Sequence, residues 1–190
     1  MTLGQILLIV IGHTGEKGLP GRTRLQKLVY FLSKRMHLPA SYSPYYYGPY
    51  SEQVSASLES LVERGLIDEN VNTFESDGPF EGKKYTYTLT EDGRAVMEAL
   101  RRKHADEFQR ISEHISALLS NAPSTRALAV ASKLLILRER SREHAASPGK
   151  LRRLAEKFGW RDISNQDVRD GVDLLVKYGH TATELPVELY

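Results

Sequence analysis

The sequence predicts a mainly α-helical protein with a small β-hairpin, an α+β fold, on three observations. Several segments carry apolar residues at helical spacing, one segment carries them at alternate positions, and turn-forming residues separate the segments. The chain has 190 residues, 41% hydrophobic and 26% charged, which is ordinary for a globular protein. Cysteine is absent, so disulfides, thiolate catalysis and iron–sulfur clusters are excluded.

Three helices are predicted in the first third of the chain. The first covers the apolar residues 3–12, and the glycine-rich stretch 12–21 is expected to be a flexible connector. The second helix runs from about Thr23 to Met36. The third begins near Ser51, a favourable N-cap, and stops at a glycine, residue 65. Residues 38–50, between the second and third helices, are expected to be irregular or strand-like.

A β-hairpin follows the third helix. Residues 66–74 and 83–89 form its two arms, because the second arm alternates tyrosine or leucine with threonine and turn residues lie between the arms. The order of three helices and a hairpin is typical of a winged helix-turn-helix, in which the third helix of DNA-binding members enters the major groove. We therefore expect a winged helix-turn-helix domain over residues 1–95.

The rest of the chain is predicted to be helical, with a helical region over residues 96–180 and a tail over 181–190. A long helix is expected after Thr90, and its apolar stripe packs either in a homodimer or against this chain's own C-terminal helices. The stripe comprises Val96, Leu100, Phe108, Ile111, Ile115 and Leu118. Further helices are expected from Ser124 to about Arg140, at Ser147–Pro148 and from Ser164.

Several short motifs resemble known families. The junctions at residues 63–67 and 85–93 resemble those of MarR- and PadR-type regulators. The segment Gly21–Phe31, with its Leu-Gln-Lys-Leu core, and the segment Tyr47–Ser51, with its Gly-Pro, resemble the YwgA-like proteins and more distantly Panacea/SocA-type antitoxin domains. The resemblance covers about residues 20–95. It implies transcription control or toxin neutralisation without enzyme activity.

Two sets of residues are candidates for DNA contacts. Residues 22–35 contain five cations and no acid, which suits either phosphate contacts or a solvated helix face. Polar side chains on the third helix are chemically able to read base edges. The predicted DNA-binding residues are Arg22, Arg24 and Lys27 on phosphate, Gln53, Ser55 and Ser57 on bases, and Lys83 and Lys84 from the hairpin.

The charge of the third helix and the hairpin opposes DNA binding. Residues 51–64 carry three acids against one cation, and residues 68–84 carry five acids against two cations. Acidic side chains repel the phosphate backbone. The sequence therefore leaves two functions open. The first is a DNA-binding transcriptional regulator, and the alternative is an antitoxin-like or adaptor protein whose winged helix binds a protein, such as a toxin.

Tyrosines are concentrated in the connector before the third helix, where residues 42–50 hold five of the ten in the chain. Tyrosine buries apolar area while keeping a polar tip, so such rings cover a core, stack on bases or form a partner interface. The predicted partner-binding residues are Tyr45, Tyr46, Tyr47 and Tyr50.

No catalytic residue, metal site or cofactor is predicted. Asp68, Asn70 and Asn72 begin like a calcium loop, but the sixth and twelfth positions hold Thr73 and Pro79 instead of glycine and glutamate. No two of the six histidines stand three or four residues apart. The longest aliphatic run, residues 6–11, is far shorter than the ~20 residues of a membrane helix. Without a signal-peptide pattern either, we expect a cytoplasmic, non-enzymatic protein.

Overall fold

The computed structural model describes residues 1–74, 82–121, 124–144, 153, 156–157, 159–160 and 164–180. The chain forms two compact units. Unit 1 comprises Met1–Ser41 and Ser51–Ser116, and unit 2 comprises Tyr42–Tyr50 and Ala117–Tyr190. The tyrosine-rich segment thus belongs to the unit formed by the C-terminal residues, although it stands between the second and third helices of the sequence.

Unit 1 is mainly helical with one small antiparallel sheet, so the predicted α+β class is confirmed. The sheet has the strand order β1-β3-β2. In chain order the elements are α1 (Leu3–Gly12), η1 (Gly15–Lys17), β1 (Leu19–Pro20), α2 (Arg22–Ser33), α3 (Glu52–Glu63), β2 (Ile67–Phe74), β3 (Gly82–Leu89), α4 (Glu91–Lys103) and α5 (Ala105–Asn121), the last of which ends in unit 2.

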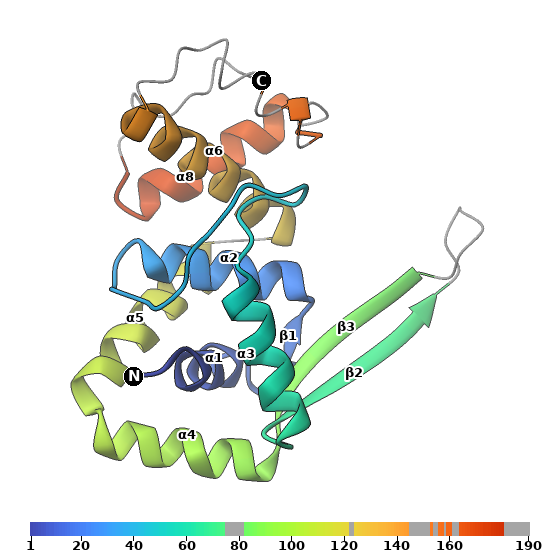
Figure 1. Cartoon of the computed structure of the whole chain (residues 1–190), viewed down its shortest axis with the longest axis vertical. Helices are drawn as coiled ribbons and strands as arrows, with labels where there is room; N and C mark the ends of the chain where they lie inside the picture. Colours follow the sequence, from blue (N-terminus) through green and yellow to red (C-terminus); the bar gives the residue numbers. More distant parts are fainter. Residues whose placement is uncertain are drawn as a thin grey trace. The chain divides into compact units, whose positions relative to one another are not determined.

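Helix α1 forms the centre of unit 1 (Figure 1). Residues 6–11 are at most 1% exposed, and a helix that is apolar on every side is stable only when other elements surround it. Helices α2, α3 and α4 and strand β3 all pack against α1. The predicted first helix is confirmed. Helix α2 ends three residues earlier than predicted, because the backbone tightens into three-residue turns from Lys34 onward.

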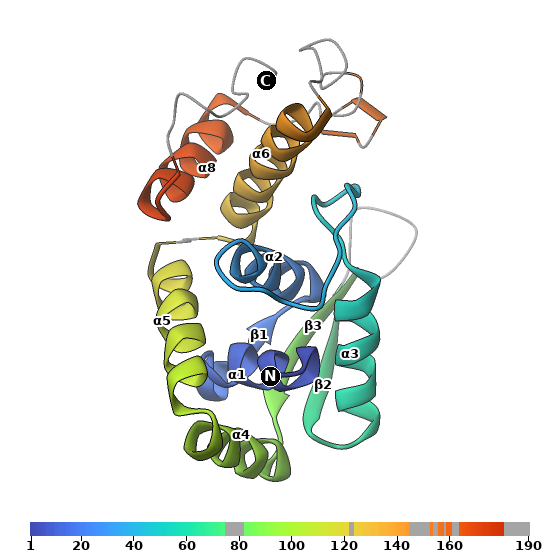
Figure 2. The same ribbon diagram turned by 60° about the vertical axis from the view of Figure 1, so that its left-hand side comes forward.

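The predicted hairpin is confirmed, and its arms pair from Ile67 opposite Leu89 to Phe74 opposite Gly82. The expectation of a purely flexible connector at residues 12–21 is wrong, because this stretch contains the 3₁₀ helix η1 and strand β1. Strand β1 pairs with the free side of β3, with Leu19 opposite Tyr87. Figure 2 shows the resulting sheet beside α3.

The α3–β2 junction, before the hairpin, contacts the β3–α4 junction, after it. The hydroxyl of Thr90, the N-cap of α4, donates to the carbonyl of Gly65 at 2.7 Å and accepts from Gly93 N–H at 3.0 Å. The Thr90 N–H donates to the Leu66 carbonyl at 3.2 Å. A Cβ atom on Gly93 would lie 2.0 Å from that same carbonyl oxygen. The start of α4 therefore packs backbone to backbone on the end of α3, which only glycine at position 93 permits.

A helix follows Thr90 as expected, but the prediction of one continuous long helix is wrong, because the segment forms two helices, α4 and α5. His104 leaves helical geometry, with φ −130° and ψ 47°, and separates α4 from α5. In both views the break turns α5 along the side of α1 (Figures 1 and 2). Leu100, Phe108, Ile111, Ile115 and Leu118 of the predicted stripe are buried within the single chain, whereas Val96 is 37% exposed. A homodimer through this stripe stays a prediction.

In unit 2, helices α6 (Thr125–His144) and α8 (Asn165–Lys177) pack against each other. Ser124 and Ser164 cap them as predicted, and the predicted burial of residues 134–137 is confirmed. Arg126 donates two hydrogen bonds, of 2.6 and 2.7 Å, to the Asp167 carboxylate. These bonds, with those from Ser164, hold the pKa of Asp167 well below its usual value. The predicted helix at Ser147–Pro148 and the tail over 181–190 lie outside the described residues.

Across the described ranges, the structure contains no helix that is both long and apolar enough to cross a membrane.

Exchanging Gly93 for alanine tests the close contact between α4 and Leu66. In an ordinary helix, Gly→Ala stabilises by about 0.5–1 kcal/mol. Gly93→Ala is expected instead to lower the unfolding free energy by about 2 kcal/mol, because the added Cβ collides with a backbone carbonyl. Urea denaturation followed by circular dichroism measures the change.

The matched control is Gly4→Ala in α1, where an added Cβ lies 3.8 Å from the nearest Leu61 side-chain atom, an ordinary contact. This variant is expected to be neutral or stabilising. Equal effects of the two variants would contradict the packing described.

Candidate functional site

Arg22, the first predicted phosphate contact, is bonded to other side chains of unit 1, although its own side chain is 46% exposed. Its Nε donates to the Tyr87 hydroxyl at 2.9 Å, and its Nη2 donates to the Glu69 carboxylate at 3.0 Å. The Tyr87 hydroxyl also donates to Glu69, at 2.5 Å. A second carboxylate, Glu59 of α3, lies 3.8 Å from Nη1. The cation is therefore engaged by acids that link the start of α2 to α3 and the sheet.

The Arg22–Glu69–Tyr87 cluster shifts the pKa of each member. Burial alone would raise the pKa of the Glu69 carboxyl, but hydrogen bonds from Tyr87 and Arg22 and the Arg22 charge hold it below its usual value. Hydrogen bonds to Tyr87 and Glu69 raise the pKa of Arg22. Burial and the bond to Glu69 raise the pKa of Tyr87. All three groups thus keep the ionisation that the cluster needs at neutral pH.

Lys27 and Arg24 are less accessible than a DNA-contacting face requires. The expectation that Lys27 lies on an exposed basic face is wrong, because it is only 2% exposed on the buried side of α2. Arg24 is half-buried, and burial lowers its pKa. Of the five cations predicted along residues 22–35, Lys34 and Arg35 are exposed, and the Lys34 ammonium lies 4.5 Å from the centre of the Tyr30 ring.

Gln26 places the start of α3 against α2. Its side-chain amide donates to the Ser51 carbonyl at 2.9 Å and accepts from the Ser51 N–H at 3.0 Å, and the residue is only 4% exposed. The same amide donates to the Ser55 hydroxyl at 3.3 Å. A buried amide needs such partners, which accounts for a glutamine among the buried residues of α2. Sequence reasoning missed Gln26 as a positioning residue, although a polar residue on a buried helix face was the available signal.

Two of the predicted base-reading residues of α3, Gln53 and Ser55, are also bonded within unit 1. Gln53 accepts from the Ser51 hydroxyl at 2.9 Å and donates to the Ser41 hydroxyl at 3.0 Å, while its side chain stays exposed. Ser55 and Ser57 are half-buried. The structure thus brings Gln53 and Ser55 to the start of α3, where both take part in the local hydrogen bonding of that helix end.

Lys83 and Lys84, the predicted hairpin contacts, are exposed on β3. They pair in register with Thr73 and Asn72 of β2. Asp77 and Glu81, two of the five acids counted over residues 68–84, lie outside the described residues.

The tyrosine-rich segment in unit 2 presents three rings to solvent. Tyr45, Tyr46 and Tyr47 are 56%, 55% and 59% exposed, whereas Tyr50 is half-buried. A bridge between Ser43 and Tyr50 closes the segment into a loop. The rings of Tyr46 and Tyr47 meet edge to face at 4.9 Å, and those of Tyr45 and Tyr50 lie 5.4 Å apart. We call Tyr45, Tyr46 and Tyr47 the tyrosine patch.

Trp160 fixes the backbone of the tyrosine patch through hydrogen bonds. Its indole N–H donates to the backbone carbonyls of Tyr45 at 3.0 Å and Tyr46 at 2.9 Å, and the residue is fully buried. The neighbouring Gly159, with φ +66°, faces the Tyr46 ring so closely that a Cβ would lie 2.6 Å from it. Sequence reasoning missed Trp160, although it is the one tryptophan in the chain.

Lys133 of α6 packs on the ring of Trp160. Its ammonium lies 5.3 Å from the centre of the Trp160 ring, within the range of a cation–π contact. Burial, together with the charge of Arg126, lowers the pKa of Lys133 to about 8. Lys133 is therefore packed on the same indole that fixes the loop backbone.

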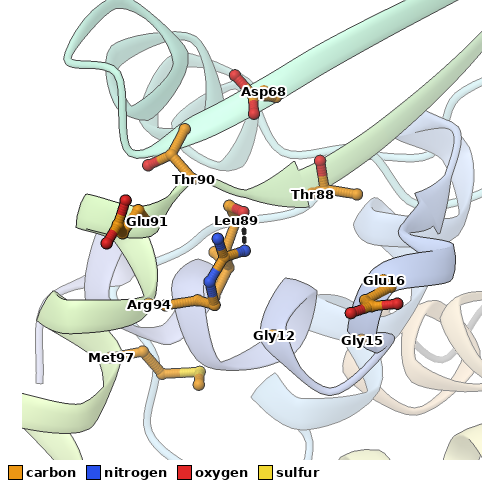
Figure 3. Close-up of a pocket in the computed structure, with 10 residues that line it drawn as sticks. All are labelled: Gly12, Gly15, Glu16, Asp68, Thr88, Leu89, Thr90, Glu91, Arg94 and Met97. Carbon is orange, nitrogen blue, oxygen red and sulfur yellow. Dashed lines mark hydrogen bonds between the residues drawn. The ribbon is translucent and has the colours of Figure 1, made fainter.

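A pocket of about 630 Å³ lies wholly within unit 1, where the end of α1, η1, the β2–β3 hairpin and the start of α4 meet (Figure 3). Carboxylates of Glu16, Asp68 and Glu91 surround it, and Gly12 and Met97 contribute apolar surface. No group of three or more histidine, aspartate or glutamate side chains within the described ranges is placed to hold a metal ion.

These features define a class of protein: a mainly helical α+β chain with a three-stranded antiparallel sheet in one of its two units. No protein-family model matches the chain. Its sequence is 33% identical over 132 residues to the uncharacterized protein YwgA of Bacillus subtilis (strain 168), a match covering 68% of this chain and 70% of YwgA. The chain belongs to the YwgA family, as the resemblance in its sequence predicts.

The Glu69 carboxylate is expected to stabilise unit 1 in a pH-dependent way. Glu69→Gln removes the charge that Arg22 and Tyr87 bind and is expected to cost about 1–2 kcal/mol of unfolding free energy at pH 7. Because the folded-state pKa lies below the unfolded value, this contribution is present above about pH 4.5 and is lost as the pH falls through the folded pKa. Urea titrations of both proteins across pH 3–7 measure it.

Glu63→Gln provides the control, since Glu63 is an exposed carboxylate at the end of α3. Its effect is expected to stay within about 0.5 kcal/mol at every pH. A Glu69→Gln difference that does not shrink in acid would show that the carboxylate charge is irrelevant to the cluster.

Proposed function

We propose that unit 1 is a winged helix-turn-helix. The order helix, strand, helix, helix, strand, strand over α1, β1, α2, α3, β2 and β3 supports this assignment, as does the antiparallel strand order β1-β3-β2. Helix α3 then occupies the recognition-helix position and the β2–β3 hairpin is the wing. The likeness of the junctions at residues 63–67 and 85–93 to those of MarR- and PadR-type regulators agrees with this reading.

We further propose that the protein is a non-enzymatic regulatory protein of the antitoxin-like or adaptor type, which binds another protein rather than DNA. The observation that carries this proposal is the tyrosine patch, three rings more than half exposed on one loop. Contiguous exposed aromatic side chains mark interaction sites, and tyrosine is enriched among the residues that dominate binding energy.

The anchoring of the loop strengthens the proposal. Because the Trp160 indole fixes the carbonyls of Tyr45 and Tyr46, the rings stand on a pre-shaped backbone. A pre-organised surface loses less conformational entropy on binding than a mobile one. When a partner buries these rings, little of the favourable free energy of burying aromatic surface is therefore offset by the entropy lost in ordering the loop.

DNA binding is the second candidate, favoured by the exposure of Lys83 and Lys84 on the proposed wing. Against it stand the bonds that engage Arg22 and Gln53, the burial of Lys27 and the acids of α3. Glu52, Glu59 and Glu63 are all exposed on that helix and would face the phosphate backbone.

Affinity capture from the native source, with nuclease added, tests which surface is used. The full chain is expected to retain one protein at near-equal stoichiometry. A variant with Tyr45, Tyr46 and Tyr47 all changed to serine is expected to lose it by about tenfold or more, since truncating central aromatic anchors costs about 2 kcal/mol or more.

Two controls accompany this experiment. Val176→Ser changes an apolar residue of unit 2 that is 46% exposed on α8, and Lys83→Ala with Lys84→Ala changes the wing. Both are expected to retain the partner. Circular dichroism and the emission of the single tryptophan confirm that each variant is folded. Loss of the partner with the wing variant but not with the serine variant would refute the tyrosine patch as the binding surface.

A further inference from the structure

The ammonium of Lys133 lies where a charge is unfavourable. The residue is half-buried on α6, and its Nζ lies 5.3 Å from the centre of the Trp160 ring. Within the ranges that the structure describes, no carboxylate forms an ion pair with it, and the charge that acts on it, Arg126, has the same sign. An apolar side chain would fill the same space without the cost of burying a charge. The charge itself therefore needs an explanation.

The indole of Trp160 is the group that attracts this charge. Trp160 is fully buried, and a cation over an aromatic face is attracted more strongly when it is shielded from water. The cation also draws electron density from the ring, and polarisation of this kind strengthens the hydrogen bonds that the polarised group donates. A charged Lys133 therefore makes the indole N–H a stronger donor than a neutral one does.

The indole N–H holds the loop that carries the tyrosine patch. It donates to the carbonyls of Tyr45 at 3.0 Å and Tyr46 at 2.9 Å. Two backbone bonds between Ser43 and Tyr50, of 3.0 and 2.9 Å, close the same loop. Contacts therefore run without a break from the ammonium on α6, through the indole, to the backbone beneath the exposed rings, and all of them lie within unit 2.

The charged groups around Lys133 differ in how they respond to pH. Arg126, on the same helix, donates to Asp167 of α8, and this pairing raises the pKa of Arg126 and lowers that of Asp167. Residues 42–50 of the tyrosine loop include no acid, basic residue or histidine. The described charged residues nearest to Trp160 in the sequence are Glu156 and Lys157. Burial and the charge of Arg126 lower the pKa of Lys133 to about 8, so its charge, unlike that of the Arg126–Asp167 pair, changes between pH 7 and 9.

We propose that Lys133 is a positioning residue of the tyrosine patch: its ammonium strengthens the indole bonds to Tyr45 and Tyr46, and its neutralisation loosens the loop. The charge of one lysine on α6 then sets how well the patch is shaped for binding. The consequence for a partner rests on the proposed protein-binding function, whereas the coupling between Lys133 and the loop does not.

The single tryptophan gives one indole N–H signal in an NMR spectrum of the ¹⁵N-labelled full-length protein. This proton is expected to move upfield between pH 7 and 9, with a midpoint near pH 8, because its hydrogen bonds weaken as Lys133 loses its proton. The titration needs no variant, so it tests the coupling in the natural chain.

Two variants fix the charge at position 133. Lys133→Arg keeps a cation at every pH, and Lys133→Met fills a similar space without one. At pH 7 the arginine variant is expected to keep the wild-type indole shift and hydrogen-exchange rates. The methionine variant is expected to show the shift that the wild type reaches at pH 9, with about threefold faster exchange of the indole and Tyr50 N–H groups, as loss of one cation–π contact implies. Lys177→Met, which removes an exposed cation of α8, is the control and is expected to leave the titration unchanged.

Overall stability separates positioning from a general structural role. Because the pKa of Lys133 lies below its value of 10.5 in an unfolded chain, the buried ammonium opposes folding, and this penalty is relieved as the pH rises from about 8. Lys133→Met is therefore expected not to lower the urea midpoint at pH 7, although it loosens the loop. A lowered midpoint together with unchanged indole and Tyr50 signals would make Lys133 a structural residue and overturn the proposal.

Affinity capture at pH 7 tests the consequence for binding. Of the protein that the wild-type chain retains, the methionine variant is expected to retain about threefold less than the arginine variant. Equal retention by the two variants would overturn the role of the charge in binding. An indole signal that does not titrate between pH 7 and 9, or an arginine variant that behaves like the methionine variant, would overturn the coupling. Titration and rescue by arginine without any captured protein would uphold the coupling and refute the proposed protein-binding function instead.

Discussion

Hydrogen bonds inside unit 1 engage polar side chains of α2 and α3, both a buried one, Gln26, and two exposed ones, Arg22 and Gln53. Arg22 is bonded to Glu69 and Tyr87, Gln26 to the backbone of Ser51, and Gln53 to Ser51 and Ser41. Binding DNA through Arg22 would first have to offset the loss of its bonds to Glu69 and Tyr87. Two of the residues suggested for DNA thus serve to position α2, α3 and the sheet.

The tyrosine patch and the pocket differ in chemistry and lie on different units. The tyrosine patch in unit 2 is aromatic and rests on a loop fixed by Trp160, which suits a protein partner. The pocket in unit 1 is lined by exposed carboxylates beside Gly12 and Met97. Because the two surfaces share no residues, variants in one test it without altering the other.

Much of the fold followed from local patterns. Helix α1, the β2–β3 hairpin and the caps at Ser51, Thr90, Ser124 and Ser164 were all readable, because each depends on residues close together in sequence. The break at His104 and the strand β1 were not, since the first serves packing around α1 and the second pairs with a strand more than 60 residues away. The candidate site was harder to predict from the sequence than the fold. Charge counts located the cations of α2 but could not reveal that Glu69, 47 residues from Arg22, binds one of them, and the tyrosine cluster gave no hint of Trp160.

We propose that Arg22, Gln26 and Gln53 stabilise unit 1 through their hydrogen bonds and that the protein does not use them to bind DNA. The most direct measurement is capture of fragmented genomic DNA from the native source on the full-length protein, followed by sequencing of the retained fragments. The account predicts that no sequence is enriched over the input. A reproducibly enriched motif, whose retention is lost in Gln53→Ala and in Lys84→Ala, would contradict it and restore the recognition-helix role of α3.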